Sequence, residues 1–279
     1  MLYWPKKRTS IQAGCVGSRE IVVTQTNKKV GLALGAGSVR GFAHIGVLEV
    51  LQQAGIPIDY VAGSSVGSLI GAAYCSGMSV EKIEAIAAEF KWHKFAGPAW
   101  SGDGLASFEK MEKFIDQVFE QPMFSDLKIP LSIVATDIDS DEAVVISAGR
   151  VAPVVRASCS VAGVISPVEW NGRRLSDGIF VNAVPVSVVK EMGADYVIGV
   201  DVLKPFIRPR GGWIGYLVNA IEIALRHAGG GTKSADCLIA PDIGGFSYLR
   251  YSKRNLLIER GRQAAEEKLP EIQQALFGK

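Results

Sequence analysis

The chain of 279 residues is 48% hydrophobic and 21% charged, which excludes disorder over most of its length because enough apolar material is present for a core. The formal net charge of +2 is spread unevenly: residues 1–29 hold six Lys or Arg and one Glu, so the rest of the chain is slightly acidic. This balance predicts no large groove for nucleic acid. We expect residues 1–29 to be a poorly ordered basic extension, although a transit peptide has a similar composition, and residues 30–279 to form one domain.

Two further features concern the environment of the protein. No apolar run approaches the ~18 residues that a membrane span requires. The four cysteines, Cys15, Cys75, Cys159 and Cys237, lie far apart without a CxxC pair, as is typical of free thiols in a reducing compartment. We therefore expect a cytoplasmic protein that can contact a membrane peripherally; the oligomeric state stays open.

From Val30 onward, short apolar segments alternate with helix-like segments. The apolar run 30–34 leads into the glycine-rich loop 35–41 and then into apolar residues at helical spacing. A second run, 58–62, leads into the loop 63–67 and another helix. Further strand-like runs follow at 131–136, 196–201 and 236–240, and helix-like ones at 184–192, 213–227 and 253–276. This alternation predicts an α/β fold with a parallel sheet.

Residues 63–67 read Gly-Ser-Ser-Val-Gly and match the G-x-S-x-G pattern of a nucleophile elbow. The pattern alone is common, but here an apolar strand precedes it and a helix of small residues follows it, as an elbow requires. Gly63 and Gly67 leave space on both sides of Ser65, so the turn can hold the serine hydroxyl at the carboxyl edge of the sheet. This context favours a nucleophilic serine over a simple glycine-rich turn.

The loop 35–41 follows the preceding strand and should emerge at the same sheet edge as Ser65. The amides there that could receive an anion or an oxyanion belong to Gly35, Ala36, Gly37 and Ser38. A dinucleotide fingerprint fits poorly, because its third glycine comes one residue late and Arg40 takes its place. Arg40 could bind a lipid phosphate or pair with a surface acid, and the second is the commoner arrangement at a helix start.

Aromatic and basic side chains alternate in residues 90–100. This composition fits a cap or a patch that contacts lipid. It fits equally well a lid loop whose aromatic side chains pack on the core, so the sequence does not choose between these interpretations.

The sequence leaves the identity of a catalytic base open. Only three histidines are present, and His227 would permit a Ser–His–Asp triad in the order Ser65, Asp177, His227. Asp177 and Gly178 follow a predicted hairpin at 171–172, and an Asp-Gly pair by itself is usually just a turn.

Taken in order, these motifs resemble those of the patatin-like phospholipases. The resemblance runs from about Val30 to Asp242. It rests on the two glycine loops, on Ala135-Thr136-Asp137, on Arg156-Ala157-Ser158, and on Leu175-Ser176-Asp177-Gly178 with Asn182 and Pro185. It implies a three-layer α/β/α sandwich with a mainly parallel central sheet, and acyl-ester hydrolysis by a Ser–Asp dyad without metal or organic cofactor.

The resemblance also assigns roles to single residues. Ser65 matches the nucleophile, Asp177 the general base, and the backbone of 35–38 the oxyanion hole. The glycines of the elbow and of the dyad turn are Gly63, Gly67 and Gly178. Two departures affect the expected shape of the substrate site: Ile179 stands where the family usually has Gly or Ala, and residues 161–165 differ from the family's Ile-Pro-Gly-x-Phe.

A Ser–Asp dyad is chemically reasonable, because desolvation raises the pKa of a carboxylate and makes it a stronger base. We therefore predict a serine acyl hydrolase for lipid or related carboxylic esters. The alternatives are a Ser–His–Asp esterase that uses His227, and a non-catalytic regulator that keeps the fold and binds lipid.

Overall fold

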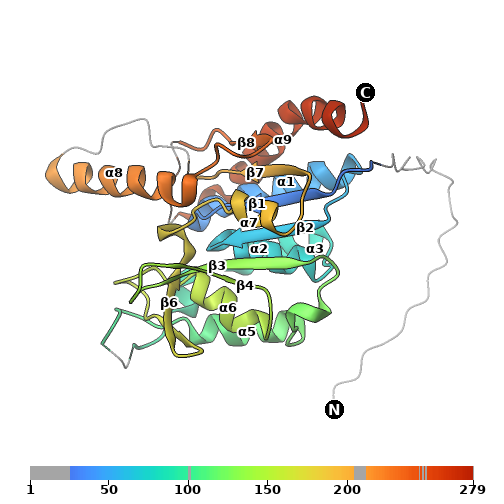
Figure 1. The fold of residues 1–279 in the computed structure, drawn as a ribbon. Coiled ribbons are helices and arrows are strands. Elements are labelled where there is room, and N and C mark those ends of the chain that lie inside the picture. Colours follow the sequence, from blue (N-terminus) through green and yellow to red (C-terminus); the bar gives the residue numbers. More distant parts are fainter. Residues whose placement is uncertain are drawn as a thin grey trace, which may run out of the picture.

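A mixed sheet of eight strands runs through the computed structural model, which describes residues 26–99, 102–203, 212–244, 246, 248 and 250–278 (Figure 1). The strands are β1 (Val30–Leu34), β2 (Tyr60–Ser64), β3 (Leu131–Asp137), β4 (Ala143–Ile146), β5 (Val168–Trp170), β6 (Arg173–Asp177), β7 (Tyr196–Val200) and β8 (Cys237–Ile239). Their order is β5-β6-β3-β2-β1-β7-β8, and β4 pairs with β3. Strands β3, β2, β1, β7 and β8 are parallel to one another, whereas β4, β5 and β6 form antiparallel pairs.

Helices cover both faces of the sheet unequally. They are α1 (Phe42–Gln53), α2 (Val66–Cys75), α3 (Val80–Glu89), α4 (Trp92–Phe95), α5 (Glu109–Phe119), α6 (Val151–Ser158), α7 (Val186–Glu191), α8 (Gly212–His227) and α9 (Arg254–Phe277). Helices α1, α2, α6 and α9 share one large core with the sheet, while α7 packs on the opposite face and α8 projects from the body (Figure 1). The predicted three-layer α/β/α architecture is confirmed, with one thin layer.

The strands expected at 30–34, 131–136, 196–201 and 236–240 are present to within one or two residues, and the predicted hairpin at 171–172 joins β5 to β6. The strand expected at 58–62 begins later, at Tyr60. The predicted extension lies outside the described residues up to position 25. The described cysteines, Cys75, Cys159 and Cys237, are free and buried, as expected.

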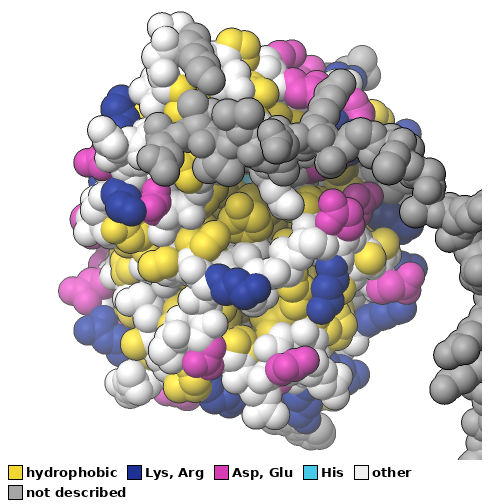
Figure 2. All heavy atoms as spheres, turned by 90° about the vertical axis from the view of Figure 1, so that its right-hand side faces the viewer, with side chains coloured by type: hydrophobic (Ala, Val, Ile, Leu, Met, Phe, Trp, Pro, Cys, Tyr) yellow, Lys and Arg dark blue, Asp and Glu magenta, His cyan; other side chains and the backbone are white. Residues whose placement is uncertain are grey.

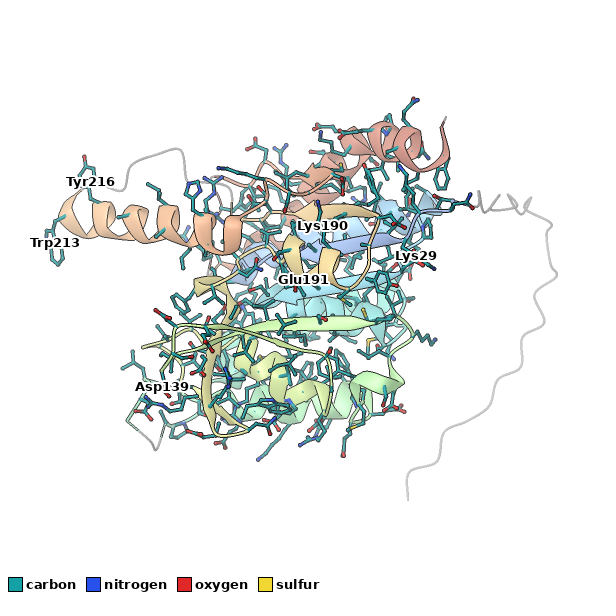
Figure 3. All side chains as sticks on the ribbon, viewed as in Figure 1. Lys29, Asp139, Lys190, Glu191, Trp213 and Tyr216 are labelled. Carbon is teal, nitrogen blue, oxygen red and sulfur yellow. The ribbon has the colours of Figure 1, made fainter. Side chains whose placement is uncertain are left out.

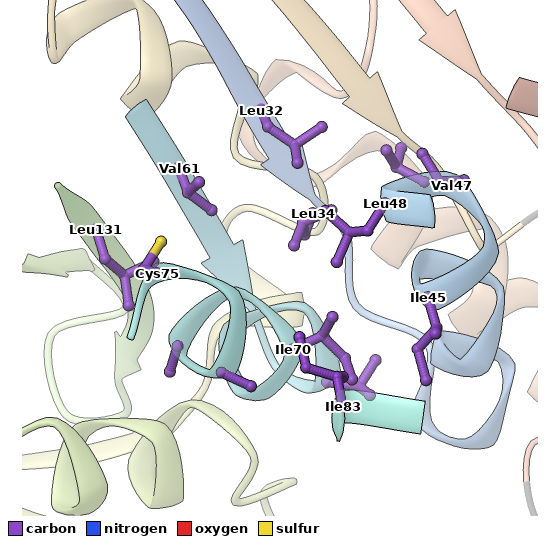
Figure 4. Close-up of a cluster of buried hydrophobic side chains, with 14 of the residues drawn as sticks. Leu32, Leu34, Ile45, Val47, Leu48, Val61, Ile70, Cys75, Ile83 and Leu131 are labelled. Carbon is purple, nitrogen blue, oxygen red and sulfur yellow. The ribbon is translucent and has the colours of Figure 1, made fainter. Parts of the chain in front are cut away.

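The main core lies between the sheet and the helices that follow β1 and β2. Leu32 and Leu34 of β1 are fully buried against Ile45 and Leu48 of α1 (Figure 4). On the other face, a Cβ on Gly31 would lie 1.9 Å from Cγ1 of Val189, so only glycine lets α7 approach β1 this closely. Alternate residues of one strand thus fix two different layers.

On one face of the molecule, charges of both signs are mixed (Figure 2). Figure 2 shows the face on the right of Figure 1, where basic and acidic side chains are interspersed and do not form blocks of one sign. Within the described ranges, no helix combines the length and the apolarity that are needed to cross a membrane.

Helices α1 and α9 cross at two glycines. A Cβ on Gly46 would lie 2.0 Å from the carbonyl oxygen of Ile258, and a Cβ on Gly261 would lie 1.9 Å from that of Ala43. Both obstacles are backbone atoms, which cannot turn away as a side chain can. The crossing therefore requires glycine at both positions. It holds α9 against α1, the helix that follows the first glycine loop.

We expect Gly261→Ala to destabilise the protein, although the same change in an unobstructed helix stabilises by about 1 kcal/mol. The added methyl group would force α1 and α9 apart, and overpacking of this kind costs roughly 1–3 kcal/mol. Thermal unfolding should show a midpoint lowered by several degrees. Glu266→Ala, at an exposed position of the same helix, is the matched control and should leave the midpoint nearly unchanged. An unchanged or higher midpoint for Gly261→Ala would show that the helices do not cross this closely.

Candidate active site

One edge of β3 brings the predicted nucleophile and base together. Strand β2 pairs with the first part of that edge and ends with Ser64 opposite Val134. Strand β6 approaches from the opposite direction along the same edge and ends with Asp177 opposite Ala135, the next residue of β3. The two strand ends therefore meet head to head, and Ser65, which follows Ser64, must lie beside Asp177.

Ser65 occupies a strained turn at this junction. Its φ of 52° and ψ of −125° lie outside the regions that non-glycine residues favour, as a nucleophile elbow requires. Its amide donates to Oγ of Ser158 over 2.9 Å, and that hydroxyl donates in turn to the carbonyl of Val134 over 2.7 Å. The buried hydroxyl of Ser158 thus links the strained backbone of Ser65 to β3 and stabilises it.

The elbow glycines allow strand β2 and helix α2 to approach each other. A Cβ on Gly63 would lie 2.6 Å from Cα of Ser68, and a Cβ on Gly67 would lie 2.1 Å from the carbonyl oxygen of Leu34. Gly67 therefore also sets how closely α2 approaches the end of β1.

Asp177 accepts a hydrogen bond directly from the hydroxyl of Ser65. Oγ of Ser65 donates to Oδ2 of Asp177 over 2.7 Å, and the amide of Ile179 donates to Oδ1 over 2.9 Å. Thr136 donates to the backbone carbonyl of Asp177. A Cβ on Gly178 would lie 2.3 Å from the carbonyl oxygen of Val134, so the glycine lets the chain turn away directly beneath β3. Ile179 thus contributes its backbone amide, which any residue except proline at this position would also contribute.

The carboxylate is a stronger base than an exposed aspartate. Asp177 is 1% exposed, and this burial raises its pKa from 3.8 to about 7, against the hydrogen bonds from Ser65 and Ile179, which lower it. Ser65 is 7% exposed and so remains close to the surface. Asp177 is therefore a better acceptor for the serine proton than an exposed aspartate would be.

The loop after β1 contains the four amides that were predicted as oxyanion donors. The amide of Gly35 already donates to the carbonyl of Val200, and that of Ala36 donates to the carbonyl of Ala183. These two predicted donors are therefore used in holding the loop. The next two amides, those of Gly37 and Ser38, have no acceptor among the described residues.

His44 holds the same loop from below. Its Nε2 lies 2.8 Å from the carbonyl oxygen of Gly35, and the ring is fully buried. Burial lowers the pKa of His44 to about 4, so the ring is neutral at ordinary pH and donates its proton to Gly35. Its Nδ1 has no hydrogen-bond partner. The sequence identified His44 only as part of a helix.

Arg40 reaches a segment that is distant in the sequence. The side chain is fully buried. Its guanidinium donates to the carbonyl of Phe246 and to the hydroxyl of Tyr248, and it lies 3.8 Å from the centre of the Tyr248 ring. Ser38 and Val39 also donate to the backbone carbonyl of Tyr248. Arg40 thus joins the glycine loop to the segment that holds Phe246 and Tyr248.

The histidine considered for a triad lies elsewhere. His227 is exposed at the end of α8, and no hydrogen bond joins it to Ser65 or Asp177. The direct contact between Ser65 and Asp177 leaves no space for an imidazole between them. Within the described ranges, no group of three or more His, Cys, Asp or Glu is placed to hold a metal ion.

An apolar pocket begins beside the dyad. Its wall includes Ser38 from the glycine loop and Val66, the residue that follows the nucleophile. It continues along α2 past Ala73 and is closed by side chains of α3, α4 and α5: Ile83, Ile86, Ala87, Phe90, Trp92, Phe114, Ile115 and Phe119. From Val66 to Ala73 the helix rises roughly 10 Å. The lining thus includes the residue that follows Ser65, but neither Ser65 nor Asp177.

The described aromatic side chains of the stretch at 90–100 pack inside the protein near this pocket. Phe90 is buried, stacks on Phe95 with centroids 4.5 Å apart, and meets Trp92 edge to face. Trp92 in turn stacks on Phe108. These aromatic side chains pack on the core and line the pocket.

Two residues of the site carried no predicted role. Ser158 belongs to a motif that the resemblance included, but only the structure shows that its hydroxyl links the elbow to β3. Cys159 lies buried beside the dyad. Burial and then the charge of Asp177 raise the pKa of its thiol well above the ordinary value, while the hydroxyls of Ser68 and Ser65 lower it. No spacing rule could have found either contact.

Comparison with known proteins gives a consistent result. The Patatin-like phospholipase family matches residues 32–190 of this chain. Among curated proteins, the chain is similar to patatin-like phospholipase domain-containing protein ZK370.4 of Caenorhabditis elegans, with 36% identity over 185 residues, and to lysophospholipase NTE1 of Coccidioides immitis (strain RS), with 34% identity over 181 residues. Each alignment covers 63% of this chain but only 14% and 12% of those proteins.

A solved structure shares the fold. The crystal structure of VipD from Legionella pneumophila superimposes with a TM-score of 0.59, covering 89% of this chain and 68% of that one, at 12% sequence identity. At this identity the similarity supports the α/β architecture alone.

We expect Asp177→Asn to stabilise the protein more at high pH than at low pH. The folded-state pKa of about 7 is above the ordinary value of 3.8, so the wild-type chain loses stability as the pH rises between these two values. Asparagine has the same shape and does not ionise. The difference in unfolding midpoint between variant and wild type should therefore grow between about pH 4 and about pH 7 and stay constant above that range. A constant difference would mean that Asp177 is not desolvated.

Proposed function

This chain belongs to the patatin-like phospholipase family, and we propose that it is a serine acyl hydrolase that cleaves the ester bonds of lipids with a Ser65–Asp177 dyad. The observation that carries the proposal is the 2.7 Å hydrogen bond from the hydroxyl of a strained elbow serine to a fully buried carboxylate. A contact of this kind has no evident structural purpose, because burying an aspartate costs stability.

In the proposed reaction, Oγ of Ser65 attacks the ester carbonyl carbon while its proton passes to Asp177. Collapse of the tetrahedral intermediate releases the alcohol, which takes up that proton, and leaves an acyl-enzyme. A water molecule then gives its proton to Asp177, attacks the acyl group and releases the fatty acid, and Ser65 recovers its proton. A carboxylate with a pKa of about 7 is matched to both transfers near neutral pH.

The developing oxyanion would be bound by the amides of Gly37 and Ser38. Their lack of other acceptors supports this role, as do the contacts that hold the loop rigid at Gly35, Ala36 and Arg40. Donors that are fixed before the reaction stabilise the transition state without rearranging, and each contributes on the order of 3–4 kcal/mol.

The acyl chain would occupy the apolar pocket along α2, since its wall begins at Val66 next to the nucleophile. We propose a lipid substrate that presents one acyl chain to this pocket, such as a lysophospholipid. The name of the lysophospholipase from Coccidioides immitis supports this class of substrate.

The other candidate functions are less well supported. A Ser–His–Asp triad would need His227, which is exposed at the end of α8 and not bonded to the dyad. A lipid-binding regulator would not need the elbow strain at Ser65 or the desolvated carboxylate.

We expect Ser65→Ala to abolish hydrolysis of p-nitrophenyl esters and of lysophosphatidylcholine, because the variant lacks the nucleophile. Labelling by a fluorophosphonate probe should disappear as well. Ser64→Ala is the matched control: the neighbouring hydroxyl is buried without a hydrogen bond, so its loss should leave turnover within about tenfold, or 1.4 kcal/mol in the barrier.

A second pair of variants tests the base. Asp177→Asn should remove nearly all activity, whereas His227→Ala should keep turnover within about tenfold. Full activity in Ser65→Ala, or a loss in His227→Ala as deep as that in Asp177→Asn, would contradict the dyad.

We expect Ala87→Phe to shorten the acyl chains that are accepted. Ala87 lines the pocket on α3, and a phenyl ring there would fill the space of a long chain while leaving the dyad untouched. Hydrolysis of p-nitrophenyl palmitate should fall at least about tenfold, and hydrolysis of the butyrate ester should not change. Ala85→Phe, on the exposed side of the same helix, is the control. An equal effect on both esters would place the acyl chain elsewhere.

A further inference from the structure

Large exposed hydrophobic side chains gather on one side of the molecule. Among the described residues, eleven such side chains are exposed, and eight of them lie in loops at the carboxyl edge of the parallel strands or on α8. They are Leu105, Ile138, Val161, Val164, Phe180, Trp213, Tyr216 and Ile223. A concentration of this kind marks an interaction surface, whereas scattered exposed residues need no explanation.

Two of these side chains follow the dyad or its hydrogen-bond partner in the chain, and two others lie beside each other. Phe180 follows Asp177 by three residues, and Val161 follows Ser160, whose carbonyl receives the amide of Asp177. The amide of Leu105 donates to the carbonyl of Val164, which places these two exposed residues side by side. Leu105 is 83% exposed, an extreme value for a leucine.

Helix α8 extends this surface away from the body. Its base is next to the dyad loop, because a Cβ on Gly229, just beyond the helix, would lie 2.6 Å from the carbonyl oxygen of Val181. Trp213 and Tyr216 lie at its far end and point away from the protein, on the side opposite Lys29 (Figure 3). Trp213 is 75% exposed and Tyr216 is 67% exposed.

We propose that Leu105, Val161, Val164 and Phe180, together with Trp213, Tyr216 and Ile223 of α8, form a docking face that inserts into the interface between a lipid bilayer and water. The proposal rests on the proposed function for the nature of its partner, since the substrate of a lipid acyl hydrolase is held in such an interface. The docking face includes Phe180, three residues after Asp177, so that docking would bring an ester bond toward Ser65.

The composition of the docking face supports a lipid partner. Tryptophan and tyrosine concentrate at membrane interfaces, because the ring is apolar and its N–H or O–H stays hydrated. One cluster of charges nearby is compensated within the chain: Arg174 pairs with Asp139 and Asp103. The surface can therefore enter an apolar layer without carrying an unpaired charge from this cluster.

The test is flotation of the full chain with vesicles of phosphatidylcholine, and with vesicles of equal parts phosphatidylcholine and phosphatidylglycerol. We expect the wild type to float with the vesicles. The double variant Trp213→Ser/Tyr216→Ser should bind them at least about tenfold more weakly, because it lacks two aromatic side chains that would be buried in the bilayer interface. The control Met123→Ser/Val145→Thr removes two exposed hydrophobic side chains at other places and should bind like the wild type.

Hydrolysis of soluble p-nitrophenyl butyrate separates this proposal from the proposed function. The Trp213/Tyr216 variant should keep that activity while it loses activity on lysophosphatidylcholine in vesicles. Failure of the wild type to float, or unchanged flotation of the variant, would overturn the docking face even if the soluble ester is cleaved. A wild type that is a dimer, converted to a monomer by the double substitution and bound to no vesicle, would overturn it in favour of contact between two copies of the chain.

Discussion

Everything at this site depends on one edge of β3, which pairs with two strands that arrive from opposite directions. Because β2 ends opposite Val134 and β6 ends opposite Ala135, the sheet register itself determines the distance between Ser65 and Asp177. A shift of either strand by one residue would turn the side chain to the other face of the sheet. The register is protected by Gly178, which has no room for a Cβ beneath Val134, and by Ser158, which links the elbow to the same carbonyl.

Burial then gives these two ordinary side chains their chemistry. In water an aspartate is a poor base for a serine proton, but desolvation raises the pKa of Asp177 to about 7. The same desolvation costs folding stability, which the rest of the fold must offset. Part of the offset comes from the close packing at Gly31, Gly46 and Gly261, where helices approach the sheet or each other at backbone distance.

The site, its pocket and the proposed docking face occupy the same end of the molecule for a topological reason. Parallel strands place their following loops at one edge, so the glycine loop, the elbow and the loop after β3 converge there. The pocket extends along α2 from Val66. Helix α8 ends close to Val181, in the segment that follows Asp177, and projects away from the body (Figure 1). In the proposed function, the docking face, the dyad and the acyl pocket would therefore act on the same lipid from one end of the molecule.

The sequence alone determined the parallel part of the fold and the elbow, because apolar runs, glycine loops and helical spacing are local signals, and the order of motifs resembled a known family. Apart from that resemblance, local signals did not single out Asp177: the Asp-Gly pair at 177–178 is locally just a turn, and only the pairing of β6 with β3 makes Asp177 a buried partner of Ser65. The sequence also did not show that Arg40 contacts Phe246 and Tyr248, which lie more than 200 residues away. It also counted the amides of Gly35 and Ala36 as free, since no local pattern shows that Val200 and Ala183 accept them. Contacts between distant segments are set by tertiary packing, and for that reason they were decided only in the folded chain.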